Sequence, residues 1–137
     1  MILKVAEKAH EGLRRISRGK PHIRITKDDK WIKQHGTNQI NTAMVDYSLL
    51  PSDWQTERTV GSQIALDAIF DAIEKDRPLD DDFIENTSNL LHAKWLERNS
   101  KRATDEQQSS YDALSEVEKE KDRVFVRSAI EVYQSTQ

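Results

Sequence analysis

The acidic residues between positions 67 and 85 have the spacing of a metal site shared by two helices. Asp67, Asp71 and Glu74 recur at helical intervals and therefore fall on successive turns of one helix. Asp82 and Glu85 fall at the start of the next helix. If the two helices are antiparallel and face each other, these carboxylates could hold a hard cation such as Mg²⁺, which prefers oxygen ligands.

Helical nucleotide pyrophosphohydrolases use acidic pairs on neighbouring helices in this way. A metal-dependent enzyme of that kind, built on Asp71, Glu74, Asp82 and Glu85, is therefore one alternative function. However, only seven residues, including Pro78, separate Glu74 from Asp82. A solvated helix face and a helix N-terminus, where carboxylates favour the positive end of the dipole, explain both groups equally well. We expect no metal site and favour a non-enzymatic function.

The other reactive residue types form no known catalytic or metal-binding motif. The chain has no cysteine, which excludes disulfides, thiolate metal sites and a cysteine nucleophile. No two histidines have the three- or four-residue spacing that places two ligands on one helix face; they are His10, His22, His35 and His92. Glycine-rich phosphate loops, nucleophile elbows and catalytic triads are also absent from the sequence. We expect no cofactor and no metal requirement for folding.

The most specific stretch is YDALSEVEKEKDRVFVRSA, residues 111–129, and it follows HAKWLERN at 92–99. The first stretch resembles the end of the ryanodine-receptor (RyR) domain repeat, which has a Tyr-x-x-Leu-x-x-x-Glu-Lys-x-Lys-Asp-Arg signature. The matching residues are Tyr111, Leu114, Glu118, Lys119, Lys121, Asp122 and Arg123. His92 and Trp95 match the His-x-x-Trp helix of that repeat. The resemblance covers about residues 83–133.

The resemblance implies a small helical, non-catalytic module that binds a protein partner or a small anionic, nucleotide-like ligand. His92, Trp95, Arg123 and Arg127 are the candidate ligand-binding residues. Arg123 and Arg127 lie one turn apart and could present a paired cationic surface, or they could bridge to nearby carboxylates, which we favour. The chain departs from the repeat at the polar stretch 100–110, where an aromatic and glycine-containing turn is typical. The first 50 residues have no counterpart in the repeat.

The connection between the last two predicted helices is expected to be the structural centre of the RyR-like half. Trp95 is predicted to be largely buried, packed near Tyr111 and Leu114. Ser115 and Glu118 form a capping box, in which Ser115 caps the last helix and the Glu118 side chain reaches back to it.

Positive charge is concentrated at the start of the chain. Residues 1–35 contain 10 Lys or Arg and 4 Asp or Glu, although the net charge of the whole chain is -3. A basic segment of this kind could meet nucleic acid, which makes a nucleic-acid-associated protein the second alternative function. We favour charges that are solvated or that fold against the acidic remainder, because Trp31 is the only aromatic residue in the stretch. Specific nucleic-acid binding is not expected.

The pattern of apolar residues predicts a mainly α fold, a bundle of about four helices near residues 2–18, 53–76, 81–98 and 115–133. Gly19 and Pro21 form the stop signal of the first helix. Residues 22–51 are irregular, and the alternation at 22–26 could form one short strand without an obvious partner. Residues 99–110 are expected to be a flexible polar loop. Small residues around Gly61–Ala72 could pack inside the monomer or on a partner.

The 137 residues are expected to form a single domain, in which 1–50 are the basic helix and irregular segment and 51–137 are the helical core. No apolar run approaches the ~20 residues that a membrane helix needs. The N-terminus is charged from residue 4 and does not resemble a secretory signal. We therefore expect a soluble, cytoplasmic protein without a membrane partner.

Overall fold

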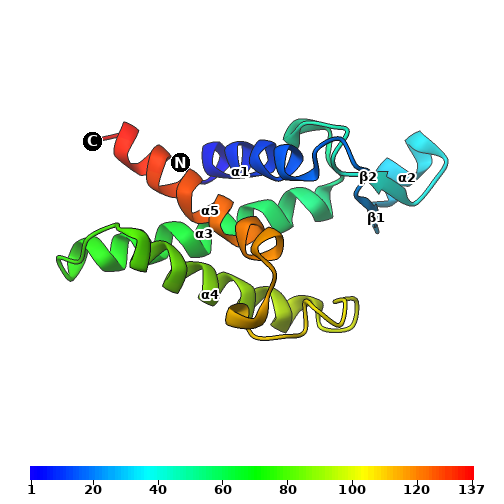
Figure 1. Ribbon diagram of the computed structural model, residues 1–137. Coiled ribbons are helices and arrows are strands. Elements are labelled where there is room, and N and C mark those ends of the chain that lie inside the picture. Colours follow the sequence, from blue (N-terminus) through cyan, green and yellow to red (C-terminus); the bar gives the residue numbers. More distant parts are fainter.

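The computed structural model describes residues 1–137 as a mainly helical protein with one small sheet (Figure 1). The helices are α1 (Ile2–Ser17), α2 (Asp29–His35), α3 (Ser52–Glu74), α4 (Asp81–Asn99) and α5 (Glu116–Ser135). The strands are β1 (Ile23–Ile25) and β2 (Gln39–Asn41), and two 3-10 turns are η1 (Tyr47–Leu49) and η2 (Tyr111–Ala113). The helical fold class is confirmed, and α1, α3, α4 and α5 are the four helices that the sequence predicts.

The segment between α1 and α3 is more regular than predicted. The short strand has a partner, because β1 pairs antiparallel with β2 and places Arg24 opposite Ile40. Helix α2, which was not predicted, lies between the two strands. Its N-terminus is capped by Asp28, whose carboxylate accepts from the Trp31 amide, and it ends at Gly36 with a φ of 69°. Gly36 therefore ends a seven-residue helix within the segment that was expected to be irregular.

Helices α1, α3 and α5 enclose the main apolar core, and α5 crosses α3 in Figure 1. The buried core residues are Val5, Ala65, Leu66, Ile69, Ala129 and Val132. A second cluster joins the hairpin segment to the start of α3 through Trp31, Ile40, Leu50 and Trp54. The basic first helix is therefore part of the folded core. None of the helices is both long and apolar enough to cross a membrane.

Glycine allows two close helix approaches. A Cβ added to Gly61 on α3 would lie 2.9 Å from Cε1 of Phe125 on α5. A Cβ added to Gly12 on α1 would lie 2.6 Å from a methyl carbon of Val124, also on α5. The small-residue stripe that begins at Gly61 is thus used inside the monomer, where it admits the larger side chains of α5.

The polar stretch after α4 forms hydrogen-bonded turns. Thr104 and Gln107 exchange two bonds, in which each backbone amide donates to the other residue's side-chain oxygen, at 3.0 and 3.1 Å. The Gln108 side chain donates to the Ser100 carbonyl at 2.9 Å. These turns bring Arg102, Thr104 and Gln107 against the cleft described below.

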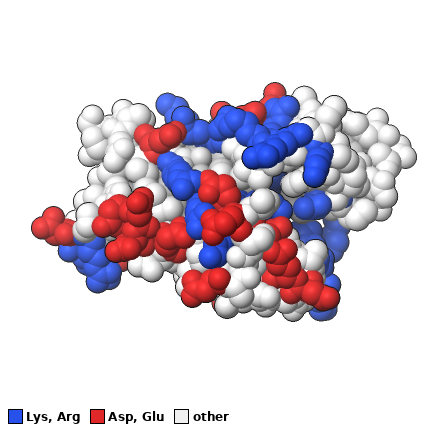
Figure 2. All heavy atoms as spheres, viewed as in Figure 1, with Lys and Arg blue, Asp and Glu red and all other residues white.

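Charge is segregated on the surface. Figure 2 shows Lys and Arg gathered over α1 and Asp and Glu gathered around the connection between α3 and α4. Part of the basic face meets the acidic remainder, because Lys8 pairs with Glu131 of α5 at 3.0 Å. The prediction that the basic segment folds against the rest of the chain is confirmed at this contact.

Candidate functional site

A cleft of about 440 Å³ lies where α1, the β1–β2 hairpin, α3, α4, the turns after α4 and α5 meet. Of the four predicted ligand-binding residues, the structure places His92 and Trp95 in its wall but not Arg123 or Arg127. The cleft combines aromatic rings with many cationic side chains. Its size is that of a small-molecule site.

Three guanidinium groups line the cleft close to one another, and two of them lie over the ring of Trp54. They come from distant parts of the chain, since Arg24 lies on β1, Arg58 on α3 and Arg102 in the turns after α4. Arg102 lies over the Trp54 ring at 4.7 Å from its centroid, and Arg58 lies at 5.9 Å. None of the three has a carboxylate within ion-pair distance, and their protein contacts are with neutral acceptors: the Ile23 carbonyl, His10 Nδ1 and the Asn99 side chain.

The three arginines repel one another. Burial lowers the pKa of Arg58 to about 10, with a further contribution from the charge of Arg24. Burial likewise lowers the pKa of Arg24, followed by the charge of Arg102. Like charges held together at the wall of a cleft destabilise the protein unless an anion joins them.

The other cations of the cleft are neutralised by neighbouring carboxylates. Arg98 of α4 pairs with Glu57 of α3 at 3.2 Å. Lys121 pairs with Glu118 at 2.9 Å, both on α5, and Arg14 pairs with Glu11 at 2.8 Å on α1. The unpaired positive charge of the cleft is therefore confined to the cluster of Arg24, Arg58 and Arg102, which we call the arginine cluster.

A second region of the cleft is formed by His92 and Trp95 on α4 and by Asp122 and Phe125 on α5. The His92 and Trp95 rings are nearly parallel, with 13° between their planes and 6.4 Å between their centroids. His92 is buried, and its Nε2 lies 2.8 Å from the Ser109 carbonyl, which can only accept. Nε2 therefore donates to the Ser109 carbonyl, and Nδ1 faces Asp122 at 3.9 Å.

Trp95 is only partly exposed, in keeping with the sequence prediction, and it lines the cleft. Tyr111 is buried as expected, but its hydroxyl bonds to Glu85 at 3.2 Å, nearly three turns before Trp95 on α4. Leu114 is also buried. The Trp95 ring therefore offers part of its surface to the cleft.

Asp122 is a site residue that the sequence motif contained without indicating its role. Burial raises its pKa to about 8, and the negative charge of Glu118 adds to the shift while Lys121 opposes it. A carboxyl with this environment is largely neutral at pH 7. Only the folded arrangement of α4 against α5 could show this, because in sequence Asp122 stands in a run of charges.

His10 and His22 are two further cleft residues that sequence spacing did not single out. His10 is fully buried and donates from Nε2 to the Val45 carbonyl at 2.8 Å, while its Nδ1 accepts from Arg58 Nε at 3.2 Å. Burial is the main cause that lowers the pKa of both histidines. His10 is therefore neutral and orients the Arg58 guanidinium toward the cleft.

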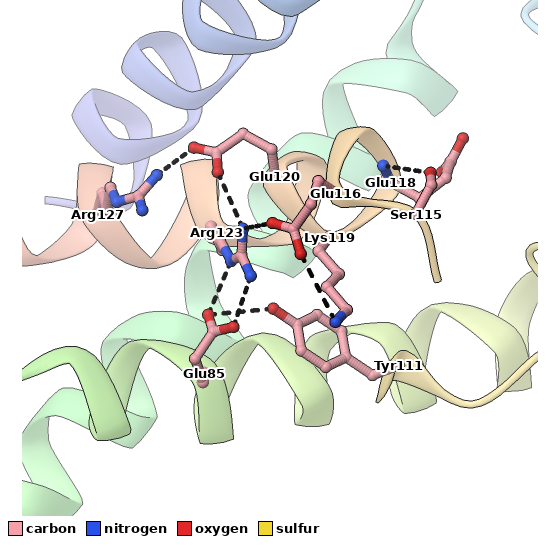
Figure 3. Close-up of polar contacts among 9 residues, drawn as sticks. All are labelled: Glu85, Tyr111, Ser115, Glu116, Glu118, Lys119, Glu120, Arg123 and Arg127. Carbon is pink, nitrogen blue, oxygen red and sulfur yellow. Dashed lines mark hydrogen bonds and ion pairs between the residues drawn. The ribbon is translucent and has the colours of Figure 1, made fainter. Parts of the chain in front are cut away.

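Arg123 and Arg127 bridge to carboxylates, as we favoured from the sequence. Arg123 binds both carboxylate oxygens of Glu85, at 2.6 and 2.8 Å, and contacts Glu116 at 2.8 Å (Figure 3). Arg127 pairs with Glu120. The hydrogen bond from Arg123 is the main cause that lowers the pKa of Glu85. The two arginines present no free cationic pair to a ligand.

The capping box is half confirmed. Ser115 Oγ accepts from the Glu118 amide at 3.3 Å, so Ser115 caps α5 (Figure 3). The prediction that the Glu118 side chain reaches back to Ser115 is wrong, because Glu118 pairs with Lys121. The Ser115 amide instead donates to the carboxylate of Glu106 at 2.9 Å. The turn segment before η2 thus supplies the missing acceptor.

Asp71 of α3 and Asp82 of α4 line one hollow between the two helices, but the acidic residues do not converge on a metal-binding arrangement. Asp71 pairs with Lys75 on its own helix at 3.0 Å, and Asp67 accepts from Gln63 at 2.7 Å. Glu85 faces Arg123 on α5. No group of three or more His, Cys, Asp or Glu residues is arranged to hold a metal ion. Asp71, Glu74, Asp82 and Glu85 therefore do not form the two-helix site on which the hydrolase alternative depends.

The chain matches no protein-family model, no curated protein and no solved structure. The resemblance of residues 83–133 to the RyR domain repeat stays a prediction.

Proposed function

We propose that this protein is a non-enzymatic binding module whose cleft takes a small phosphate-bearing ligand. The observation that carries the proposal is the arginine cluster: three guanidinium groups in the wall of one cleft, without a carboxylate partner among them. Arginine forks bind phosphate through paired, charge-assisted hydrogen bonds. A bound anion would relieve the repulsion among these guanidinium groups.

The position of the cluster favours a small ligand over a protein partner. Arg58 is partly buried beside Trp54, and the hairpin and the turns after α4 bring Arg24 and Arg102 to the same cleft. A flat protein surface would not reach such a recess. The proposal includes the RyR-like character of residues 83–133, because His92 and Trp95, which carry that resemblance, line the cleft. It also includes the cytoplasmic location expected from the sequence.

Calorimetric titration with sodium sulfate and with adenosine monophosphate tests the proposal. Arg24→Ala and Arg102→Ala should each raise the Kd about tenfold or more, since a hydrogen bond to a charged group contributes ~1.5–3 kcal/mol. Arg127→Ala is the matched control, because Arg127 lies outside the cleft, and it should bind as the wild type does. If neither anion binds the wild type, the proposed function is wrong. Equal losses in all three variants would place the site elsewhere.

A further inference from the structure

Asp122 is the only carboxyl of the cleft without a bound donor. The other two, Glu57 and Glu118, are paired with Arg98 and Lys121. The Asp122 side chain is 18% exposed, and the nearby His92 Nδ1 lies 3.9 Å away, beyond hydrogen-bond distance. Burying an ionised carboxylate without donors is costly, so the neutral acid is the form that fits this position.

The groups around Asp122 agree with a neutral acid. From α4 it faces His92 Nδ1 at 3.9 Å, and from α5 it faces Glu118, whose charge disfavours a second carboxylate. Lys121 is engaged by Glu118. The remaining charged or titratable residues of the cleft come from the other walls: His10, Arg14, His22, Glu57 with Arg98, and the arginine cluster. Burial raises the pKa of Asp122 to about 8, whereas the pKa values of His10 and His22 are lowered, so neither histidine titrates above pH 7.

We infer that Asp122, as a neutral carboxylic acid, is the specificity residue of the cleft. It donates a hydrogen bond to the aromatic heterocycle of a phosphate monoester, and the phosphate of this ligand lies on the arginine cluster. This inference rests on the proposed function and names its ligand class. The two regions of the cleft suit the two parts of such a ligand. The phosphate matches the guanidinium groups, and a planar ring matches the wall of Trp95 and Phe125, where stacking is favourable.

A polar donor among aromatic walls selects a ring that carries an acceptor. A ligand with only an anion would leave Asp122 unpaired, and a purely apolar ring would leave its hydroxyl without an acceptor. A phosphate monoester whose heterocycle has ring nitrogens suits both regions, because the nitrogens accept from Asp122 and the phosphate binds the arginine cluster. Because Asp122 must retain its proton in the complex, binding of such a ligand becomes weaker as the pH rises through the pKa that Asp122 has in the ligand-free protein.

The experiment compares the binding of adenosine monophosphate and sulfate by the wild type between pH 7 and pH 9, by calorimetry at constant ionic strength. Sulfate does not titrate in this range, and the nucleotide phosphate is already a dianion. We expect the Kd for adenosine monophosphate to rise about tenfold from pH 7 to pH 9, as loss of one required proton near pH 8 predicts. The Kd for sulfate, which contacts only the arginine cluster, should stay within about twofold.

Asp122→Asn supplies the discriminating variant, since its amide keeps a donor that does not titrate. It should bind adenosine monophosphate at pH 7 within about threefold of the wild type, and its Kd should not change up to pH 9. Asp112→Asn, at an exposed position outside the cleft, is the control and should keep the wild-type pH dependence. A pH-independent wild type, or a variant that keeps the dependence, overturns the role of Asp122 while leaving the arginine cluster intact. Binding of neither anion by the wild type at any pH removes the proposed function itself.

Discussion

At the residue scale, the most consequential group is the Asp122 carboxyl. Its pKa is about 8 in the folded protein and near 3.9 in an unfolded chain. Between these values the folded state holds a proton that the unfolded state has lost. The free energy of unfolding therefore falls as the pH rises through this window, and this loss is complete above about pH 8.

Asp122→Asn should remove that pH dependence. We expect the variant to match the wild type near pH 4 and to become more stable than it as the pH rises, by ~2–5 kcal/mol at pH 9. Urea denaturation at pH 4, 7 and 9, with Asp112→Asn as the exposed control, measures the difference. A constant difference across the three pH values would mean that Asp122 is ionised in the fold, which would also remove it as a hydrogen-bond donor to a ligand.

Arg123 is expected to matter for stability rather than for ligand binding. Its side chain is 14% exposed and joins α5 to Glu85 on α4, so removal leaves three carboxylates, Glu85, Glu116 and Glu120, without their shared cation. Arg123→Ala should cost ~2–4 kcal/mol. Arg127→Ala, from a half-exposed pair with Glu120, should cost at most ~1 kcal/mol. Equal costs in chemical denaturation would show that the Arg123 contacts contribute no more than surface pairs.

At the element scale, Gly61 tests how closely α3 and α5 approach. Alanine is the better helix former, so Gly61→Ala would stabilise an exposed helix by ~1 kcal/mol. Here the added Cβ meets the Phe125 ring at 2.9 Å, and we expect a net loss of ~1–3 kcal/mol because the ring must move. Phe125 also lines the cleft, so adenosine monophosphate binding should weaken in parallel. A gain in thermal stability would show that the two helices can separate without cost.

The sequence signals for the four long helices differ in kind. The apolar residues of α1 and α5 lie clearly on one face, whereas those of α3 and α4 are only weakly one-sided. The Asp80 cap of α4 and the Ser115 cap of α5 are local signals. Helix α2 was missed because its seven residues are too short for a clear period, and only the Asp28 cap and Gly36 delimit it. The arginine cluster could not be predicted, since Arg24, Arg58 and Arg102 come together only through tertiary packing. Arg123 stood out in sequence because its motif is local to α5, although its main partner, Glu85, lies on α4.

At the scale of the whole molecule, the uneven distribution of charge determines how strongly the protein binds polyanions. The basic face over α1 is offset by Glu131 and by the acidic remainder of a chain with a net charge of -3 (Figure 2). The arginine cluster lies in a cleft of about 440 Å³, where a phosphate monoester fits and a duplex does not. The basic face and the cleft should therefore respond to different ligands.

Duplex DNA should accordingly bind only weakly and without sequence preference. We expect a Kd of ~10⁻⁴–10⁻⁶ M that weakens steeply with salt, because counterion release supplies the affinity. Fluorescence anisotropy with two unrelated duplexes at several salt concentrations measures this. Lys4→Ala combined with Arg15→Ala, on α1, should weaken DNA binding, whereas Arg102→Ala should affect adenosine monophosphate far more than DNA. Tight, salt-resistant binding to one duplex would contradict the small-ligand proposal and restore the nucleic-acid alternative.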